Sequence, residues 1–318
     1  MRALLIHNTR SGQRDRDGEV AAAVQRLVSA GWKLDVVSSA SAAELESQAR
    51  RAVDAGVDMV IAAGGDGTLN LAIQALAYRR AVLGVLPTGT TNVWAQELGI
   101  PTDIPAATQL LLSGCTARVD LGRADGRYFL FVAGIGFDAS VTREISPAAK
   151  RKLGKLAYVV AAIVQAAKLR GTEATIVADG KVSRQRVLMV VASNTRLYGG
   201  VLNMAPEAFV DDGLLDFWVF RGRGLMAAAV HALTILVGRH YQDPGARYYR
   251  SASLTVISRG SLPVQLDGDY YGVTPVTISV APEALRVVVP PGHHAILSRQ
   301  LESWNPTTTE SSRRPRRY

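Results

Sequence analysis

The fold is decided by one stretch, Met59-Val60-Ile61-Ala62-Ala63-Gly64-Gly65-Asp66-Gly67-Thr68-Leu69-Asn70. Its apolar beginning predicts a short buried strand and Leu69 begins a helical pattern, so the glycines form a turn from a strand into a helix. Glycines let the backbone approach a phosphate closely, and the first turn of a helix offers N–H groups to it. A plain strand-to-helix connection would show the same pattern. Asp66 favours a nucleotide site, because a carboxylate beside phosphates requires a cation such as Mg²⁺.

Strand and helix patterns alternate on both sides of this stretch. Apolar runs at residues 4–6, 34–37, 59–62 and 82–86 predict strands, and amphipathic stretches between them predict helices. This alternation is typical of a doubly wound parallel sheet, whose ligands bind beyond the carboxyl ends of the strands. We therefore expect an α/β domain over residues 1–122, with about residues 291–302 as a candidate for completing it.

A second turn follows the next predicted strand, with the sequence Leu86-Pro87-Thr88-Gly89-Thr90-Thr91-Asn92. A helical pattern begins after it at Val93. Since parallel strands carry their carboxyl ends at one edge of a sheet, the two turns are expected to face one cleft. Capping of the following helix by Thr91 or Asn92 is the alternative explanation.

From about Val119 the patterns become mainly β. Short apolar runs with Gly-containing connections predict an all-β, sandwich-like domain over residues 123–290, with helices near 148–169 and 225–240. Within it, residues 128–132, 276–280 and 285–289 are each expected to form a separate strand. Residues 303–318 are rich in Ser, Thr, Pro and Arg and are predicted to be a disordered basic tail.

Two acidic loops mark the β-rich part. One is Ala205–Asp216, and the other is Gln265-Leu266-Asp267-Gly268-Asp269. Oxygen-rich turns suit hard cations, and a carboxylate that faces a cleft could take a proton from a substrate hydroxyl. Ordinary Asp-Gly turns would give the same sequences.

Taken in order, five motifs resemble the diacylglycerol kinase catalytic family, which includes bacterial lipid kinases and the sphingosine and ceramide kinases. The motifs are residues 64–70, 87–92, Gly134-Ile135-Gly136-Phe137-Asp138, 205–214 and 266–269. The resemblance covers about residues 2–290. It implies ATP in a cleft between an α/β domain and a β-sandwich, and Mg²⁺-dependent transfer of the γ-phosphate to a lipid hydroxyl, the reaction of a phosphotransferase with an alcohol acceptor.

The resemblance also implies roles for single residues. Nucleotide contacts are implied at Asn8, Ser39 (or its neighbour Ser38), Ala63, Gly64, Gly65, Asp66, Gly67, Thr68, Leu69 and Thr90. Metal ligands are implied at Asp66 and, in a structural Mg²⁺ site, at the Phe209 carbonyl, Asp212 and the Leu214 carbonyl. The general base falls on Asp269, with Asp267 and Asp66 completing the implied catalytic set.

Two departures from the family pattern bear on the chemistry. Leu71 stands where the family has Glu, and Asp269 replaces a Glu, which can displace a base by about 1 Å. These departures keep open a nucleotide-regulated lipid-binding protein without turnover. A NAD kinase, which shares Gly-Gly-Asp-Gly-Thr, is a further alternative, although the second turn and the Asp-Gly-Asp loop argue against it.

The chain has 318 residues and a net charge of +9, from 36 Lys and Arg against 27 Asp and Glu. Four cations in Lys150–Lys155 precede an apolar helical pattern, which predicts peripheral contact with an anionic membrane surface or, alternatively, a solvated helix start. No nucleic-acid motif is recognisable, so we expect no nucleic-acid partner. A single cysteine, Cys115, and an N-terminus without a signal-peptide pattern predict a cytoplasmic protein, placed at the inner face of the membrane if it docks there.

Overall fold

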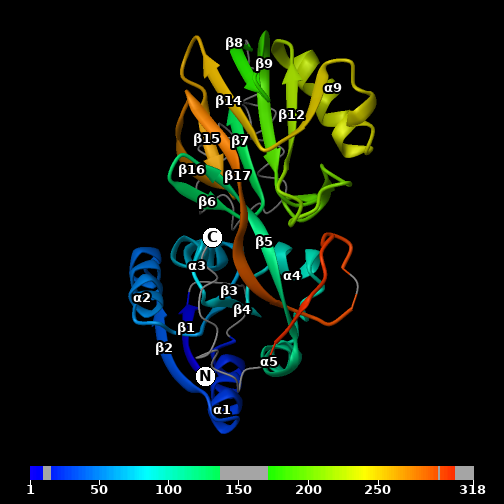
Figure 1. Ribbon diagram of the computed structural model, residues 1–318. Coiled ribbons are helices and arrows are strands. Elements are labelled where there is room, and N and C mark those ends of the chain that lie inside the picture. The colour runs from blue at the N-terminus through cyan, green and yellow to red at the C-terminus, as the bar shows by residue number, and fades with distance from the viewer. Residues whose placement is uncertain (10–15, 137–170, 293, 305–318) are drawn as a thin grey trace, which may run out of the picture. The chain divides into compact units, whose positions relative to one another are not determined.

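The computed structural model describes residues 1–9, 16–136, 171–292 and 294–304, which divide into two compact units (Figure 1). Unit 1 contains Met1–Arg118, Ala284–His294 and the segment that begins at Arg299. Unit 2 contains Val119–Glu283 and Ala295–Ser298. The units therefore divide four residues before the expected limit of 122, and the chain returns to unit 1 at Ala284, earlier than the expected 291.

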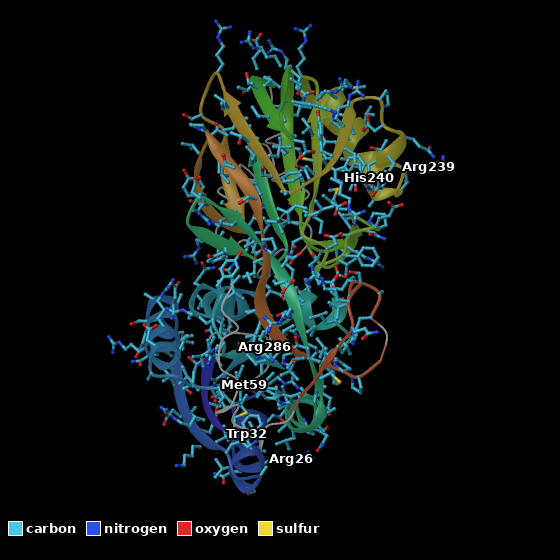
Figure 2. All side chains as sticks on the ribbon, in the orientation of Figure 1. Arg26, Trp32, Met59, Arg239, His240 and Arg286 are labelled. Carbon is cyan, nitrogen blue, oxygen red and sulfur yellow. The ribbon has the colours of Figure 1, made fainter. Side chains whose placement is uncertain are left out.

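Unit 1 is built on a parallel sheet in the order β4-β3-β1-β2. These strands are β1 (Arg2–Asn8), β2 (Lys33–Ser39), β3 (Met59–Gly64) and β4 (Val82–Pro87). Strands β3 and β4 are buried along their whole length, as expected for a sheet covered on both faces. Met59, at the start of β3, is fully buried (Figure 2). Beside β4, the sheet continues into β17 (Val276–Val289), with Val287 opposite Leu83.

The described part of unit 1 contains five helices: α1 (Asp17–Ser29), α2 (Ala42–Asp54), α3 (Asp66–Leu76), α4 (Val93–Glu97) and α5 (Ile104–Ser113). The chain passes from β1 outward to β2 and then back across β1 to β3. Right-handed crossovers therefore place α1 on one face of the sheet and α2 and α3 on the other. In agreement, α1 contacts α5 and α2 contacts α3. The doubly wound α/β architecture is confirmed.

Local sequence explains where two of these helices begin and how one of them packs. The Ser41 side chain accepts the Glu44 N–H at 3.3 Å at the start of α2, and Asp103 accepts the Ala106 N–H at 3.0 Å at the start of α5. In α2 the buried side chains recur every four residues, at Leu45, Ala49 and Val53, as an amphipathic helix on a sheet requires.

Unit 2 is an antiparallel β assembly in the order β16-β15-β7-β9-β8-β14-β17, with β12 and β13 extending from β9. The main strands are β7 (Val132–Gly136), β8 (Thr172–Ala178), β9 (Lys181–Ser193), β12 (Leu215–Arg221), β13 (Ala246–Ser251), β14 (Ser253–Ser258), β15 (Pro263–Leu266) and β16 (Asp269–Val273). The remaining elements are β5 (Cys115–Ala124), β6 (Arg127–Phe129), β10 (Leu197–Tyr198), β11 (Leu202–Asn203), α9 (Gly224–Leu236), the 3₁₀ helix η1 (His240–Gln242) and β18 (Glu302–Ser303). The last residues of β5 pair with β6, and its first residues pair in unit 1 with β18.

The core of unit 2 is formed by side chains from most of its strands. Strand β9 joins them, because its first half pairs with β8 and its second half pairs with β7 on one edge and β12 on the other. Phe129, Phe217 and Val219 have no exposed surface in this core. The sandwich-like β domain expected from the sequence is confirmed.

Two strand predictions were wrong. Residues 128–132 do not form one strand, because the Asp267 carboxylate accepts the backbone N–H groups of residues 130–132 and so separates β6 from β7. Residues 276–280 and 285–289 belong to the single strand β17, which continues past Pro282 with Glu283 at φ 49°. The predicted helix at 148–169, the cations of Lys150–Lys155, Phe137 and Asp138 of the third motif, and most of the predicted tail lie outside the described residues.

Candidate functional site

Four of the residues implied for nucleotide binding lie at the carboxyl ends of neighbouring parallel strands. Asn8 ends β1 and is paired with Ser39 at the end of β2, and the neighbouring residue His7 is paired with Ala63 of β3. Gly64 ends β3 and is paired with Pro87 of β4. Between β1 and β3 the chain changes the direction in which it builds the sheet, and the carboxyl edge at such a point is where open α/β sheets bind ligands.

The two glycine turns are packed against each other at this edge. The N–H groups of Thr88 and Gly89 donate to the Gly64 carbonyl at 3.1 and 3.3 Å. A Cβ on Gly89 would lie 2.3 Å from the Gly65 Cα, and a Cβ on Gly64 would lie 2.1 Å from the Thr68 Oγ1. Only glycine fits at either position, so the sequence permits two turns that touch backbone to backbone.

Asp66 joins the first turn to the helix that follows the second. It is the first residue of α3, and its carboxylate accepts the N–H groups of Val93 at 3.1 Å and Trp94 at 3.3 Å, the first two residues of α4. Burial raises the pKa of Asp66 above its usual value, and these two hydrogen bonds only partly oppose the shift. A nearby cation would favour the charged form of this carboxylate, so the position is suited to hold one.

Three buried oxygen atoms around the turns have no hydrogen-bond partner in the described part of the chain. They are the Thr68 Oγ1, the Thr88 Oγ1 and the Asn92 Oδ1. These three residues are at most 7% exposed. Buried polar atoms are nearly always paired in folded proteins, so three in adjacent turns indicate a site that a ligand completes. Asn92 does not cap α4, since its side chain donates to the Gly89 carbonyl at 2.9 Å and Asp66 provides the cap.

The remaining residues of the implied nucleotide set differ in exposure and in the hydrogen bonds that they already make. Leu69 is buried in α3, and the N–H groups of Thr68 and Leu69 already donate to the Gly65 carbonyl. Gly67 and Thr90 are exposed. The Ser39 hydroxyl donates to Glu44 at 2.5 Å. A direct contact between Leu69 and a nucleotide stays a prediction. The burial of the Leu69 side chain counts against it.

Sequence reasoning missed Arg16 as a residue of this edge. Its guanidinium donates to the Pro87 carbonyl at 2.9 Å, directly before the second turn, and forms an ion pair with Glu19 at 2.7 Å. The hydrogen bond to Glu19 raises the pKa of Arg16 further, so the side chain carries a permanent charge. Arg16 lies 71 residues before Pro87 in the chain, so no local pattern indicates their contact. Thr88 and Asn92 belong to the second turn motif, but the sequence did not show that their side chains are buried.

In unit 2, the Asp267 carboxylate clamps the turn that presents Asp269. It accepts the N–H groups of Leu130, Phe131 and Val132 at 2.7, 2.9 and 3.0 Å. Asp269 is exposed at the start of β16, two residues after this clamp. Asp267 thus fixes the turn that carries Asp269, while its supporting role in catalysis and the role of Asp269 as a base stay predictions.

The loop at residues 205–214 uses its carboxylates internally. Asp211 is 1% exposed and accepts hydrogen bonds from the N–H and the hydroxyl of Ser298, at 2.8 to 2.9 Å. Asp212 accepts the Leu214 N–H at 2.9 Å and forms an ion pair with Arg250. The guanidinium already supplies the positive charge that a Mg²⁺ would bring. The expected structural Mg²⁺ at Phe209, Asp212 and Leu214 therefore stays a prediction that this ion pair counts against.

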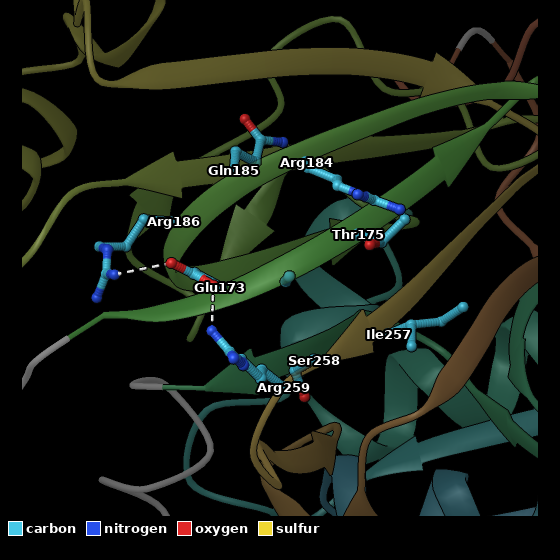
Figure 3. Close-up of a pocket in the computed structure, with 9 residues that line it drawn as sticks. Glu173, Thr175, Arg184, Gln185, Arg186, Ile257, Ser258 and Arg259 are labelled. Carbon is cyan, nitrogen blue, oxygen red and sulfur yellow. Dashed lines mark hydrogen bonds and ion pairs between the residues drawn. The ribbon is translucent and has the colours of Figure 1, made fainter.

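One surface pocket of about 530 Å³ lies elsewhere in unit 2, on strands β8, β9 and β14 (Figure 3). Glu173 lies between Arg186 and Arg259 and pairs with them at 3.2 and 3.1 Å, as the dashed lines of Figure 3 show. None of the residues singled out from the sequence lines this pocket. In the described ranges, no group of three or more His, Cys, Asp or Glu side chains is arranged to hold a metal ion. No described helix is both long enough and apolar enough to cross a bilayer.

Comparison with known proteins tests the resemblance drawn from the motifs. Residues 2–124 match the diacylglycerol kinase catalytic domain, and residues 132–289 match the YegS C-terminal NAD kinase beta sandwich-like domain. A diacylglycerol kinase of Bacillus subtilis is 31% identical over 292 residues, which cover 91% of this chain and 96% of the relative. One from Staphylococcus carnosus is 28% identical, with 91% and 95% covered.

A solved structure agrees with these sequence matches. The crystal structure of a diacylglycerol kinase from Bacillus anthracis str. Sterne has a TM-score of 0.74 and 25% sequence identity to this chain. The match covers 91% of this chain and 97% of that one. Both halves of the chain and nearly its whole length are therefore accounted for by one family, and the chain belongs to the diacylglycerol kinase family.

Proposed function

We propose that this chain transfers the γ-phosphate of ATP to the hydroxyl of a diacylglycerol-like lipid, with Mg²⁺ as the cation. The observation that carries the proposal is the pair of touching turns at the carboxyl edge of the unit 1 sheet. They combine a backbone cradle that excludes a Cβ, three unpaired buried oxygens and a carboxylate whose pKa burial raises. The names of the relatives support a lipid as the acceptor.

The chemistry of the turns fits a nucleotide with its cation. Asp66 would hold Mg²⁺, which when bound offsets the negative charge of the phosphates. The hydroxyls of Thr68 and Thr88 can donate to phosphate oxygens, and the Asn92 Oδ1 can accept from a ligand hydroxyl. Arg16 adds a fixed positive charge beside the second turn. Because the turns are held by backbone contacts and by the Asp66 cap, little reorganisation is needed when the ligand binds.

We assign the general base to Asp269. An exposed carboxylate can accept the proton of a lipid hydroxyl at one of its oxygens, provided that the backbone at the start of β16 is held in place. Asp267 meets that condition through its three hydrogen bonds. No step is assigned to a cation at residues 209–214, since Arg250 already neutralises Asp212.

The test is an incubation of the purified full chain with ATP labelled at the γ-phosphate, Mg²⁺, a mixed lipid extract dispersed in detergent, and NAD. Label in the organic phase at the position of phosphatidic acid is the expected result. Label in NAD would instead establish the NAD kinase alternative. Tight ATP binding with label in neither product would establish a nucleotide-regulated binding protein and overturn the proposal.

A further inference from the structure

The two sides of helix α9 are reversed relative to an ordinary surface helix, which buries apolar residues and exposes polar ones. Its polar side chains, His231 and Thr234, face inward, and the outward side consists of apolar residues alone. The exposed large side chains of α9 and the residue after it are Leu225, Met226, Val230, Leu233, Leu236 and Val237. Leu236 is 70% exposed and Met226 is 77% exposed. Contiguous apolar patches of this kind on a protein surface mark interaction sites.

The inward polar residues explain why the helix is stable in this orientation. The His231 Nδ1 is 2.6 Å from the Asp243 Oδ2, and the His231 Nε2 is 2.8 Å from the Arg221 carbonyl oxygen. The Thr234 hydroxyl lies 3.0 Å from the same Asp243 oxygen. The helix is therefore anchored by a buried polar cluster and by Ile235. Its apolar outer face contributes little to holding it on unit 2 and is available for another surface.

The charges around the face favour an anionic partner. Residues 217–242 contain no Asp or Glu. Arg223 precedes the helix and Arg239 follows it, both are exposed, and neither has an ion-pair partner in the described part of the chain. A helix of 13 residues is about 20 Å long, so the two cations lie on either side of the apolar face. Figure 2 shows the Arg239 side chain pointing away from the ribbon at the end of α9.

We propose that the outer face of α9 docks on the surface of a bilayer that contains anionic phospholipid. Leucine, methionine and valine side chains would enter the boundary between headgroups and acyl chains, with Arg223 and Arg239 at the level of the phosphates. The helix is too short to span a bilayer and lies flat on it. The proposal builds on the proposed function, because a kinase with a bilayer-embedded acceptor must meet the membrane, but the face itself is independent of the catalytic residues.

The test is co-sedimentation of the full chain with vesicles of phosphatidylcholine alone or with 30% phosphatidylglycerol, without ATP and without diacylglycerol. The wild-type chain should bind the anionic vesicles more tightly. Leu233→Glu/Leu236→Glu should weaken this binding at least tenfold, because two charges enter the apolar face. Arg223→Ala/Arg239→Ala should weaken it about fivefold for each arginine, on anionic vesicles only. Val182→Glu is the matched control, since Val182 is 65% exposed on β9 and should leave binding unchanged.

Four results decide the proposal. Thermal midpoints of the variants should match the wild type, because the substituted side chains are exposed. Vesicle binding by the Leu233→Glu/Leu236→Glu variant equal to that of the wild type, or equal binding to neutral and anionic vesicles, would overturn it. A wild-type dimer that this variant converts to a monomer in light scattering would assign the face to a second copy instead. Kinase turnover on detergent-dispersed lipid should be unchanged in both double variants, so a failure of docking and a failure of the kinase assignment are distinguished.

Discussion

Asp66 in unit 1 is partly buried and Asp243 in unit 2 is buried, and their pKa values shift in opposite directions. At Asp66 burial outweighs two hydrogen bonds longer than 3.0 Å, and the pKa is raised. At Asp243 burial also acts to raise the pKa, but hydrogen bonds from His231, the Gly245 N–H and Thr234 outweigh it, and the pKa is lowered. The first carboxylate still requires positive charge, and the second is satisfied by the protein itself.

This difference separates the site proposed to bind a ligand from a polar cluster that anchors a helix. Around Asp66 the side-chain oxygens of Thr68, Thr88 and Asn92 have no hydrogen-bond partner in the described part of the chain. Around Asp243 the polar groups of His231 and Thr234 are paired and secure α9. The acidic loops of unit 2 resemble the second case, since Asp211, Asp212 and Asp267 all have partners within the protein. Substitutions on the two sides should therefore differ in whether activity or stability is lost.

The largest effect is expected for Asp66→Asn. Loss of the charge should lower lipid phosphorylation by about 1,000-fold, because Asn would no longer hold the cation that offsets the negative charge of the phosphates. The thermal midpoint of the chain without nucleotide should change by less than about 3 °C, since the Asn side chain can keep one of the two hydrogen bonds to α4 and carries no charge that burial disfavours. Turnover with labelled ATP and thermal unfolding measure the two quantities. Asp54→Asn, at an exposed carboxylate of α2, is the control. A comparable loss of activity in this control would show that the effect is not specific to Asp66.

Asp269→Asn should lower kcat by about 100-fold if this carboxylate takes the proton of the lipid hydroxyl. Its side chain is exposed, so stability should be unaffected. Asp267→Asn provides the contrast, because loss of a carboxylate that accepts three N–H groups should destabilise unit 2 by about 2 kcal/mol. Steady-state kinetics and thermal unfolding of both variants are the measurements. A near-normal kcat for Asp269→Asn would place the base elsewhere.

Gly89→Ala should weaken ATP binding by about 30-fold, because the new Cβ would lie 2.3 Å from the Gly65 Cα and must push the two turns apart. Gly18→Ala in α1 is a matched control, since a Cβ there meets no atom within 4 Å. Equilibrium titration with a fluorescent ATP analogue measures the affinity. Equal affinities for the two variants would show that contact between the turns does not matter for the nucleotide.

The smallest effect is expected for Asp243→Asn, a loss of about 2 kcal/mol of stability at pH 7 without loss of turnover in detergent. The folded pKa of Asp243 is lowered, so its contribution is complete above the unfolded value of about 4 and is lost as the pH falls through the folded value. The difference in thermal midpoint between wild type and variant should therefore shrink below about pH 4. A difference that stays constant from pH 7 to pH 3 would contradict the internal pairing of Asp243.

The alternation of strands and helices in unit 1 was well predicted from the sequence, because the signals for each element are local. The apolar run Met59–Ala62 and the glycines after it specify β3 and the start of α3 without help from distant residues. The meeting of the two turns was also predictable, since both follow strands of one parallel sheet. The Asp66 cap, the Arg16 contact and the Arg250 ion pair were not, because each joins residues 27 or more positions apart and depends on packing.

The orientation of α9 could not be predicted for a different reason. The sequence Gly224–Leu236 is apolar on almost every side, so its periodicity indicates a helix but does not indicate which side is buried. The two polar residues would ordinarily be assigned to the outer side. Their partners, Asp243 and the Arg221 carbonyl, come from segments on either side of the helix, and only the folded chain shows that they draw His231 and Thr234 inward.

The division of unit 1 into distant segments has a consequence for how the chain is made. Its sheet is completed by residues of β17 beside β4, and its Trp304 indole donates to the Leu111 carbonyl at 3.0 Å. Residues 119–283, the long continuous segment of unit 2, are synthesised between the first segment of unit 1 and its two later segments. At about 5–20 residues per second, the nascent first segment of unit 1 waits roughly 10 to 30 s on the ribosome for the residues of β17 that extend its sheet. A gene fragment that ends at residue 124 would encode every residue implied for nucleotide binding and still leave one edge of β4 without β17.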